Sequence, residues 1–228
     1  MTSNLMIRLR RFTRKLGLNR LIGSLFASRR YEDLFGSALL AEVRQGDIVW
    51  DIGANLGLYT EQFLSCVGAN GAVCAFEPVP ACFDQLLERF NPASQVKLMN
   101  IAVGVEDGQI SMEINDDPLA STHRVISTQH SGRGVEVSIR SASSLVRSGD
   151  AAFPNLVKID VEGHEGAVMY GMQDLLSDSR LRCIGIEVHF GLLDERGEGA
   201  RPKQIEQSLL QHGFRVRWTD PSHLIAVR

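Results

Sequence analysis

The chain has 228 residues, of which 44% are hydrophobic and 22% are charged, and its formal net charge is -3. This length and composition fit one globular domain with a sizeable core, and no apolar run approaches the ~20 residues that a membrane-spanning helix needs. The small net charge excludes binding of polyanions through overall charge alone.

The first 30 residues differ in charge from the rest of the chain. They hold eight basic side chains and no acidic one, which leaves 16 basic against 27 acidic residues elsewhere. Apolar residues between the arginines predict a basic helical extension over residues 1–45. Three roles remain open for it: a cap on this same domain, peripheral contact with an anionic membrane or an acidic partner, or a cleaved targeting segment.

From residue 46 to residue 228, apolar runs alternate with helical patterns, which predicts one domain. Strands are expected at 47–53, 72–78, 95–104, 155–161 and 182–190, and helices at 56–68, 80–90, 164–178 and 201–214. Such alternation is typical of an α/β fold, here a Rossmann-like, doubly wound, mostly parallel sheet with helices on both faces. Two last strands around Asp220-Pro221 predict an antiparallel pair at the C-terminus.

An insertion interrupts this alternation at about residues 104–141. Residues 108–115 and 134–141 alternate apolar and polar side chains, as half-exposed strands do, and a long polar stretch separates them at 116–133. We expect a β insertion over one end of the sheet. The 116–133 stretch and the N-terminal segment would then form a lid over the substrate.

A glycine-rich turn follows the first predicted strand, in "DIGANLG". It matches neither the dinucleotide fingerprint, because Asn55 stands where a second glycine would be, nor the P-loop. The carboxylate of Asp51 would repel a pyrophosphate and attract an ammonium group, which indicates a cationic ligand with an amino-acid end. Glu77 ends the next strand, 24 residues after Gly53, and a carboxylate there suits the two hydroxyls of a ribose.

Five stretches resemble S-adenosylmethionine-dependent methyltransferases, and among these the FkbM family: "DIGANLGLYT", "FEPVP", "NIAVG", "VKIDVEGHEGAVMYGM" and "IEVHF". The resemblance implies a Rossmann-type O-methyltransferase that uses S-adenosyl-L-methionine and acts on a hydroxyl of a small molecule, a secondary metabolite or a glycan. It also implies a set of cofactor-binding residues: Asp51, Gly53, Ala54, Asn55, Gly57, Glu77 and Pro78, with Asn100, Ile101 and Ala102 beside the adenine.

Ionisable residues crowd the stretch "VKIDVEGHE", where a buried strand would be apolar. Asp160, Glu162 and His164 are the predicted catalytic residues, and Glu187 and His189 end the neighbouring strand. Because parallel strands open onto a crevice at their carboxyl ends, these side chains are expected to face one site. The alternative is a structural ion-pair network with Lys158.

The roles within this stretch stay open. His164 has the intrinsic pKa of a base, Asp160 could contact the substrate or the amino end of the cofactor, and Glu162 could orient His164. A divalent metal held by Asp160, Glu162 and Glu187 is conceivable, but their spacing is not that of a dedicated metal motif, so no metal is predicted.

Two other functions compete with methyl transfer: a nucleotide-sugar or NAD enzyme, and a non-catalytic interaction protein that keeps the fold. Nucleic acid is an unlikely partner, because the core lacks a cluster of basic and aromatic residues. The four cysteines show no C-x-x-C spacing, which favours buried free thiols in a reducing compartment. We therefore expect a cytoplasmic protein, with peripheral contact of the basic N-terminus at the inner membrane surface as an option.

Overall fold

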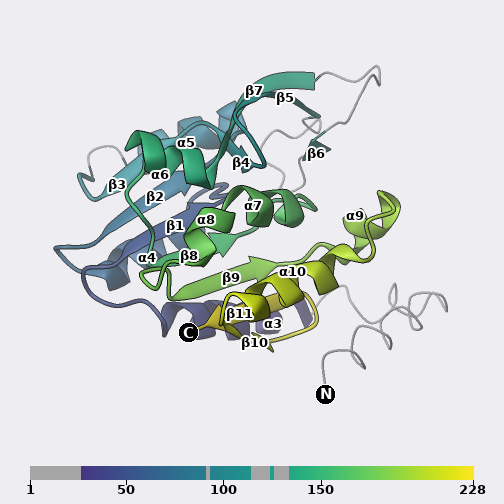
Figure 1. Ribbon diagram of the computed structural model, residues 1–228. Coiled ribbons are helices and arrows are strands. Elements are labelled where there is room, and N and C mark those ends of the chain that lie inside the picture. The colour runs from purple at the N-terminus through teal and green to yellow at the C-terminus, as the bar shows by residue number, and fades with distance from the viewer. Residues whose placement is uncertain (1–26, 91–92, 114–123, 126–133) are drawn as a thin grey trace.

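The computed structural model describes residues 27–90, 93–113, 124–125 and 134–228. The predictions for residues 1–26 and for all of the 116–133 lid except residues 124–125 therefore lie outside the described residues. The part that is described comprises a seven-stranded sheet, helices on both of its faces and a smaller second sheet (Figure 1).

The main sheet confirms the predicted doubly wound, mostly parallel architecture. Its order is β10-β11-β9-β8-β1-β2-β3, and β11 runs antiparallel to both of its neighbours, β9 and β10. The chain thus winds outward in both directions from the β1–β8 pair, which makes that pair the topological switch point. The strands are β1 Ile48–Ile52, β2 Ala72–Phe76, β3 Val96–Met99, β8 Leu156–Ile159, β9 Cys183–Glu187, β10 Arg215–Trp218 and β11 His223–Val227.

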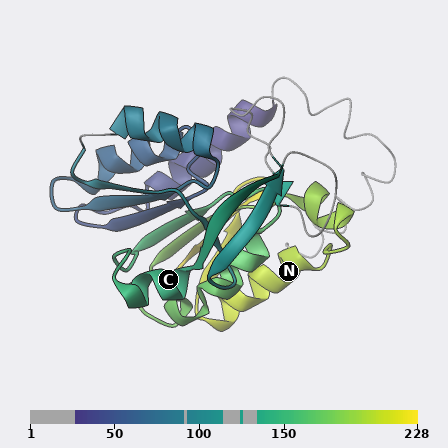
Figure 2. The same cartoon turned by 90° about the horizontal axis from the view of Figure 1, so that it is seen from above.

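Two layers of helices cover the sheet, because alternate strand residues supply apolar side chains to each face. Val49 packs with Phe35 of α3 and Phe63 of α4, whereas its neighbour Trp50 belongs to the cluster beneath α6, α7 and α10. Figure 2 shows these two layers on either side of the sheet. The helices are α3 Ala27–Leu40, α4 Leu58–Val67, α5 Pro80–Phe90, α6 Ala142–Ser148, α7 Glu165–Gly171, α8 Gln173–Leu176, α9 Phe190–Glu195 and α10 Arg201–Gln211.

Within the described ranges, no helix is both long enough and apolar enough to cross a membrane. All four cysteines are free thiols, and Cys74, Cys82 and Cys183 are buried.

The predicted β insertion is present as a second sheet with the order β4-β7-β5-β6. Its strands are β4 Ala102–Gly104, β5 Gly108–Glu113, β6 Arg124–Val125 and β7 Gly134–Ser141. The single strand predicted at 95–104 is therefore wrong, since β3 belongs to the main sheet and β4 to the second. The break falls at Asn100, whose side-chain amide donates to the carbonyl oxygens of Glu77 (2.8 Å) and Pro78 (3.1 Å) and so holds the chain at the end of β2.

The charged stretch is shorter as a strand than its alternation indicates. β8 ends at Ile159, and the chain then turns through Glu162 (φ 48°) and Gly163 (φ 88°), so Asp160 and Glu162 lie beyond the strand. β9 likewise ends at Glu187, before His189. The helix predicted at 164–178 is two helices, α7 and α8, which meet at Met172.

Candidate active site

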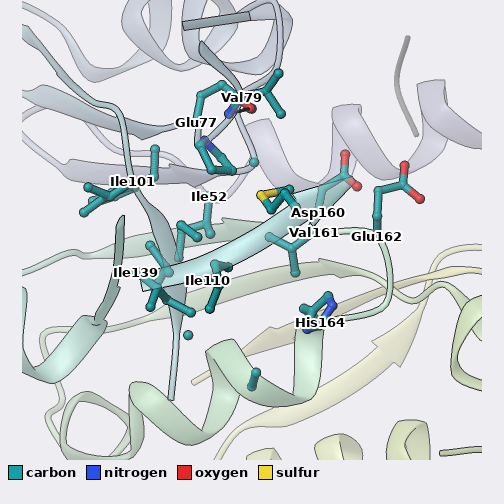
Figure 3. A pocket seen from close by; sticks show the side chains of 18 of the residues that line it. Ile52, Glu77, Val79, Ile101, Ile110, Ile139, Asp160, Val161, Glu162 and His164 are labelled. Carbon is teal, nitrogen blue, oxygen red and sulfur yellow. Dashed lines mark hydrogen bonds between the residues drawn. The ribbon is translucent and has the colours of Figure 1, made fainter. Parts of the chain in front are cut away.

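A cavity of about 560 Å³ lies at the carboxyl ends of β1, β2 and β8, beneath the second sheet. Its place at the switch point is where open α/β sheets bind ligands, and its volume is typical of a small-molecule site. Figure 3 shows that Ile101, Ile110 and Ile139 lie toward one side of it, and Asp160 and Glu162 toward the other. The cavity thus has an apolar part and an acidic part.

The glycine turn after β1 is held close to two neighbouring segments. The N–H groups of Gly53 and Ala54 both donate to the carbonyl oxygen of Phe76, each at 3.0 Å. Gly53 has φ 78°, and a Cβ at this position would lie 1.8 Å from the carbonyl oxygen of Asp160. Only glycine fits there, because a side chain would clash with the backbone that follows β8.

Glu77 fixes the other side of this turn. Its buried carboxylate accepts hydrogen bonds from the backbone N–H groups of Asn55 and Val79, both at 2.8 Å. Burial raises the pKa of Glu77 to about 7, although these two hydrogen bonds oppose the rise. Because each carboxylate oxygen can accept a further hydrogen bond, Glu77 can still bind hydroxyl groups in the cavity.

Asp51 is fully buried and lies outside the lining of the cavity. It accepts a hydrogen bond from the Thr60 hydroxyl (2.7 Å) and forms an ion pair with Lys158 (3.2 Å), its neighbour across β1 and β8. The Lys158 ammonium also lies 3.4 Å from Asp160. The alternative of a structural ion-pair network around Lys158 is therefore present in the structure. One of its members, Asp160, also lines the cavity.

The predicted site residues divide into two groups by position. Those at the cavity are Gly53, Asn55, Glu77, Pro78, Ile101, Ala102, Asp160, Glu162 and His164; those outside its lining are Asp51, Ala54, Gly57 and Asn100. The second group supports the first: Asn100 holds the end of β2, and Gly57 leaves room for Leu86 and Phe90 of α5. Direct cofactor contact by Asp51 stays a prediction.

His189 lies at the centre of the acidic part. Its Nδ1 is 2.6 Å from the carboxylate of Glu165, and its Nε2 is 3.3 Å from Glu162 and 3.8 Å from Asp160. Burial alone would lower the pKa of His189, but the hydrogen bond to Glu165 and the charges of Glu162 and Asp160 outweigh it and raise the pKa to about 9. Burial raises the pKa of Glu162 to about 7.

A second histidine supports this group from the last strand. His223 contacts Asp220 through Nδ1 (2.8 Å) and Glu187 through Nε2 (3.3 Å), and Glu187 lies 3.9 Å from Nε2 of His189. The ring of Phe35 stacks on His223 with centroids 4.5 Å apart. Helix α3 thus packs against the outer edge of the site.

His164, the predicted base, lines the cavity at the start of α7. Its Nε2 is buried and has no hydrogen-bond partner among the residues that the structure describes. Burial, together with the charge of Arg196, lowers the pKa of His164 to about 4, so its imidazole is neutral near pH 7.

Sequence reasoning missed part of this arrangement. His189 and Glu187 were expected near the site but not selected, and nothing in the local pattern marked Glu165 or His223 as their partners. Glu165 and His189 are 24 positions apart, so only the pairing of β8 with β9 brings them together. The apolar wall from the second sheet, Ile110 and Ile139, was also missed, because an alternating strand does not reveal what its apolar side faces.

The residues at the cavity fit S-adenosylmethionine. Asn55 has a buried side-chain oxygen without a hydrogen-bond partner in the described part of the chain, and Glu77 faces the same space. Val79 and Ile101 extend the apolar wall formed by Ile110 and Ile139, and the wall suits the adenine ring.

Comparison with solved structures supports the α/β fold of the domain. A Streptococcus mutans protein crystallised with SAH superposes with a TM-score of 0.52 at 12% identity, over 86% of this chain and 96% of that one. The FkbM methyltransferase domain matches residues 51–216. The chain belongs to this family and carries an S-adenosylmethionine-dependent methyltransferase domain, as the five sequence stretches predicted.

Two characterised relatives are similar in sequence. A hexuronic acid methyltransferase, AglP, from Haloferax volcanii is 35% identical over 156 residues, which are 68% of this chain and 61% of that protein. The 31-O-demethyl-FK506 methyltransferase FkbM from Streptomyces tacrolimicus is 28% identical over 184 residues, 65% of this chain and 67% of that protein. The match to the first relative thus spans less than two thirds of its length.

Proposed function

We propose that this protein transfers a methyl group from S-adenosylmethionine to a hydroxyl group of a small molecule, a secondary metabolite or a glycan. The observation that carries the proposal is that one cavity joins the two expected halves of such a site. Gly53, Asn55 and Glu77 lie at the cofactor part, and Asp160 and His164 lie at the opposite part.

In this proposal, the protein mainly aligns two ligands. The turn at Gly53 and the carboxylate of Glu77 would hold the cofactor, and the apolar wall would hold its adenine. When bound, the cofactor supplies a methyl group on a positively charged sulfur. Alignment of an acceptor oxygen in line with that carbon–sulfur bond can provide much of the rate acceleration.

His164 is the proposed proton acceptor, because it lines the cavity and its buried Nε2 has no hydrogen-bond partner among the described residues. As the new oxygen–carbon bond forms and the carbon–sulfur bond breaks, the hydroxyl proton would pass to this nitrogen. The sulfur keeps the bonding electrons and becomes a neutral thioether. The protonated His164 then returns its proton to solvent.

A carbohydrate or a polyhydroxylated small molecule is the acceptor class that we favour. The two characterised relatives are named for methylation of a hexuronic acid and of an oxygen on FK506. An acidic cavity wall is also suited to sugars, because carboxylates accept hydrogen bonds from hydroxyl groups. These observations support an oxygen acceptor and leave its identity to experiment.

We further infer that the protein works in the cytoplasm, because four free thiols suit a reducing compartment. The basic N-terminal segment, of which residues 1–26 lie outside the described residues, would contact an anionic membrane surface or an acidic partner. Co-sedimentation with vesicles tests the membrane contact. Binding should require anionic lipid and weaken at high salt, and equal binding to neutral vesicles would refute the electrostatic contact.

Methyl transfer can be tested with isotopically labelled S-adenosylmethionine and a panel of neutral glycosides, uronic-acid glycosides and polyols, with products located by mass spectrometry. The His164→Ala variant should keep its thermal shift with S-adenosylhomocysteine and lose most turnover. His212→Ala is the matched control, since His212 lies at the end of α10 and outside the lining of the cavity. Normal turnover of His164→Ala would refute its role. The absence of methyl transfer to any hydroxyl of the panel, while the protein binds S-adenosylhomocysteine, would contradict the proposed O-methylation.

A further inference from the structure

Three side chains at the acidic part of the cavity lie within reach of one cation. They are Asp160, Glu162 and His189, and one potential ligand atom from each lies within 4.8 Å of the other two. Metal–ligand bonds of about 2.0–2.2 Å keep ligand atoms at most about 4.4 Å apart. Small side-chain rotations would therefore bring the three onto a common ion.

The orientation of His189 is that of a metal-binding imidazole. Its Nδ1 faces Glu165, a residue with 0% exposure, at 2.6 Å, which directs Nε2 toward Asp160 and Glu162. Glu165 is held in turn, because the backbone N–H groups of Gly163 and His189 donate to the same oxygen. A carboxylate on the outer nitrogen fixes the tautomer of histidine ligands in metal sites.

Glu165 shows a second feature of such a site. Its other carboxylate oxygen is buried and has no hydrogen-bond partner among the described residues. A buried, incompletely satisfied carboxylate is costly, and the cost falls when the imidazole beside it carries positive charge or binds a cation. The Glu165–His189 pair thus favours positive charge at the imidazole, which a proton on Nε2 supplies in the free protein and which a bound cation would supply after displacing that proton.

Neighbouring residues also hold the carboxylates of this group. The ammonium of Lys158 lies 3.4 Å from Asp160, and His223 lies 3.3 Å from Glu187, which itself approaches His189 Nε2 to 3.9 Å. Outer partners of this kind preorganise metal ligands. Lys158 is shared with Asp51, so it compensates only part of the negative charge that converges here.

We propose that Asp160, Glu162 and His189 form a divalent-cation site in the acidic part of the cavity. Two carboxylates and one imidazole suit an ion such as Mn²⁺, which accepts both oxygen and nitrogen ligands. The site itself does not depend on the proposed O-methylation. Its role does: the ion would bind acceptor oxygens, and it would allow an anionic sugar to enter a part of the cavity lined by carboxylates.

The site can be tested on the full-length protein, freed of metal with EDTA, by titration with Mn²⁺ while the electron paramagnetic resonance signal of the free ion is recorded. We expect one bound Mn²⁺ per chain. Glu162→Gln, which changes charge without changing shape, should weaken binding by at least about tenfold. Glu106→Gln is the control, because Glu106 is an exposed acid at the same cavity but outside the group, and it should bind Mn²⁺ normally.

A second variant guards against misfolding as the cause of lost binding. His189→Asn keeps a donor that can face Glu165, and it should also lose Mn²⁺ while keeping a cooperative unfolding transition and its thermal shift with S-adenosylhomocysteine. The inference is overturned if the native protein binds no stoichiometric Mn²⁺, or if Glu162→Gln and His189→Asn both bind it normally. Thermal shifts with S-adenosylhomocysteine, recorded without metal, report separately on the proposed function, since they address the cofactor part alone.

Discussion

Gly53 leaves no room for a side chain in the turn after β1. A Cβ would lie 1.8 Å from the Asp160 carbonyl oxygen, in addition to the strain of a positive φ. Gly149 has nearly the same φ, 76° against 78°, but open space around it. Gly53→Ala should therefore lower the free energy of unfolding by at least about 2 kcal/mol more than Gly149→Ala.

Chemical denaturation of both variants measures this difference, because the strain of a positive φ is common to both and cancels. Equal destabilisation would show that the backbone after β8 moves away at little cost. Gly53→Ala should also lose binding of S-adenosylhomocysteine, whereas Gly149→Ala should keep it.

Glu77 should make stability depend on pH. Burial raises its pKa in the folded protein from 4.5 to about 7, so the folded state binds this proton more tightly than the unfolded state. The resulting stabilisation is complete below about pH 4.5 and is lost as the pH rises through about 7. The expected loss is at most about 3 kcal/mol.

Glu77→Gln cannot titrate and isolates this contribution. The stability of the native protein minus that of the variant should fall between pH 4.5 and 7.5, on top of a constant offset because Gln has one acceptor oxygen for two backbone N–H groups. Denaturation curves at several pH values measure it. A difference that does not vary with pH would contradict the raised pKa.

Individual site residues could be predicted from the sequence where a short local pattern marks them. The glycines, Asn55 and Glu77 follow strand ends, and Asp160, Glu162 and His164 form one continuous motif, so all of these could be predicted. The partners could not. Lys158 meets Asp51 because of the β1–β8 register, and Glu165 meets His189 across 24 residues, and neither pairing leaves a trace in local spacing.

Among the elements, α7 and β4 depend on an unusually close approach. A Cβ at Gly171, the last residue of α7, would lie 1.8 Å from the carbonyl oxygen of Gly104 in β4. Because β4 connects the main sheet to the apolar wall of the cavity, Gly171→Ala should shift that wall. We expect a loss of about 1–3 kcal/mol in stability and weaker binding of S-adenosylhomocysteine.

Gly166 in the same helix is the matched control. A Cβ there would meet the flexible side chain of Arg201, which can move aside, and alanine favours a helix over glycine by about 1 kcal/mol. Gly166→Ala should therefore stay within about 1 kcal/mol of the native stability. Calorimetry measures the stability of both variants, and titration with S-adenosylhomocysteine measures their binding. Equal stability and equal binding of the two variants would show that the contact between Gly171 and the Gly104 backbone does not limit substitution.

The order and type of most elements followed from hydrophobic alternation, including the antiparallel C-terminal pair and the β insertion. The errors occurred where tertiary contacts end an element. Hydrogen bonds from Asn100 to the end of β2 divide the predicted strand 95–104, and positive φ angles at Glu162 and Gly163 end the charged stretch as a strand. Such breaks depend on neighbouring segments rather than on local composition.

For the molecule as a whole, the fold class and the family could be predicted from the sequence, because both depend on strand–turn–helix order and on contiguous motifs. The shape of the cavity could not, since it forms only when the second sheet covers the carboxyl ends of β1, β2 and β8. That enclosure joins the apolar wall to the acidic part of the cavity, and the proposed methyl transfer requires both.

The most direct test of this account is a thermal-shift titration of the full-length protein with S-adenosylhomocysteine, with NAD as the comparison ligand. A ligand that binds only the folded state raises its stability, by about 2.7 kcal/mol at a concentration of 100 times Kd. We predict a saturable rise in melting temperature with S-adenosylhomocysteine and none with NAD. A rise with NAD and none with S-adenosylhomocysteine or S-adenosylmethionine would contradict binding of S-adenosylmethionine in this cavity.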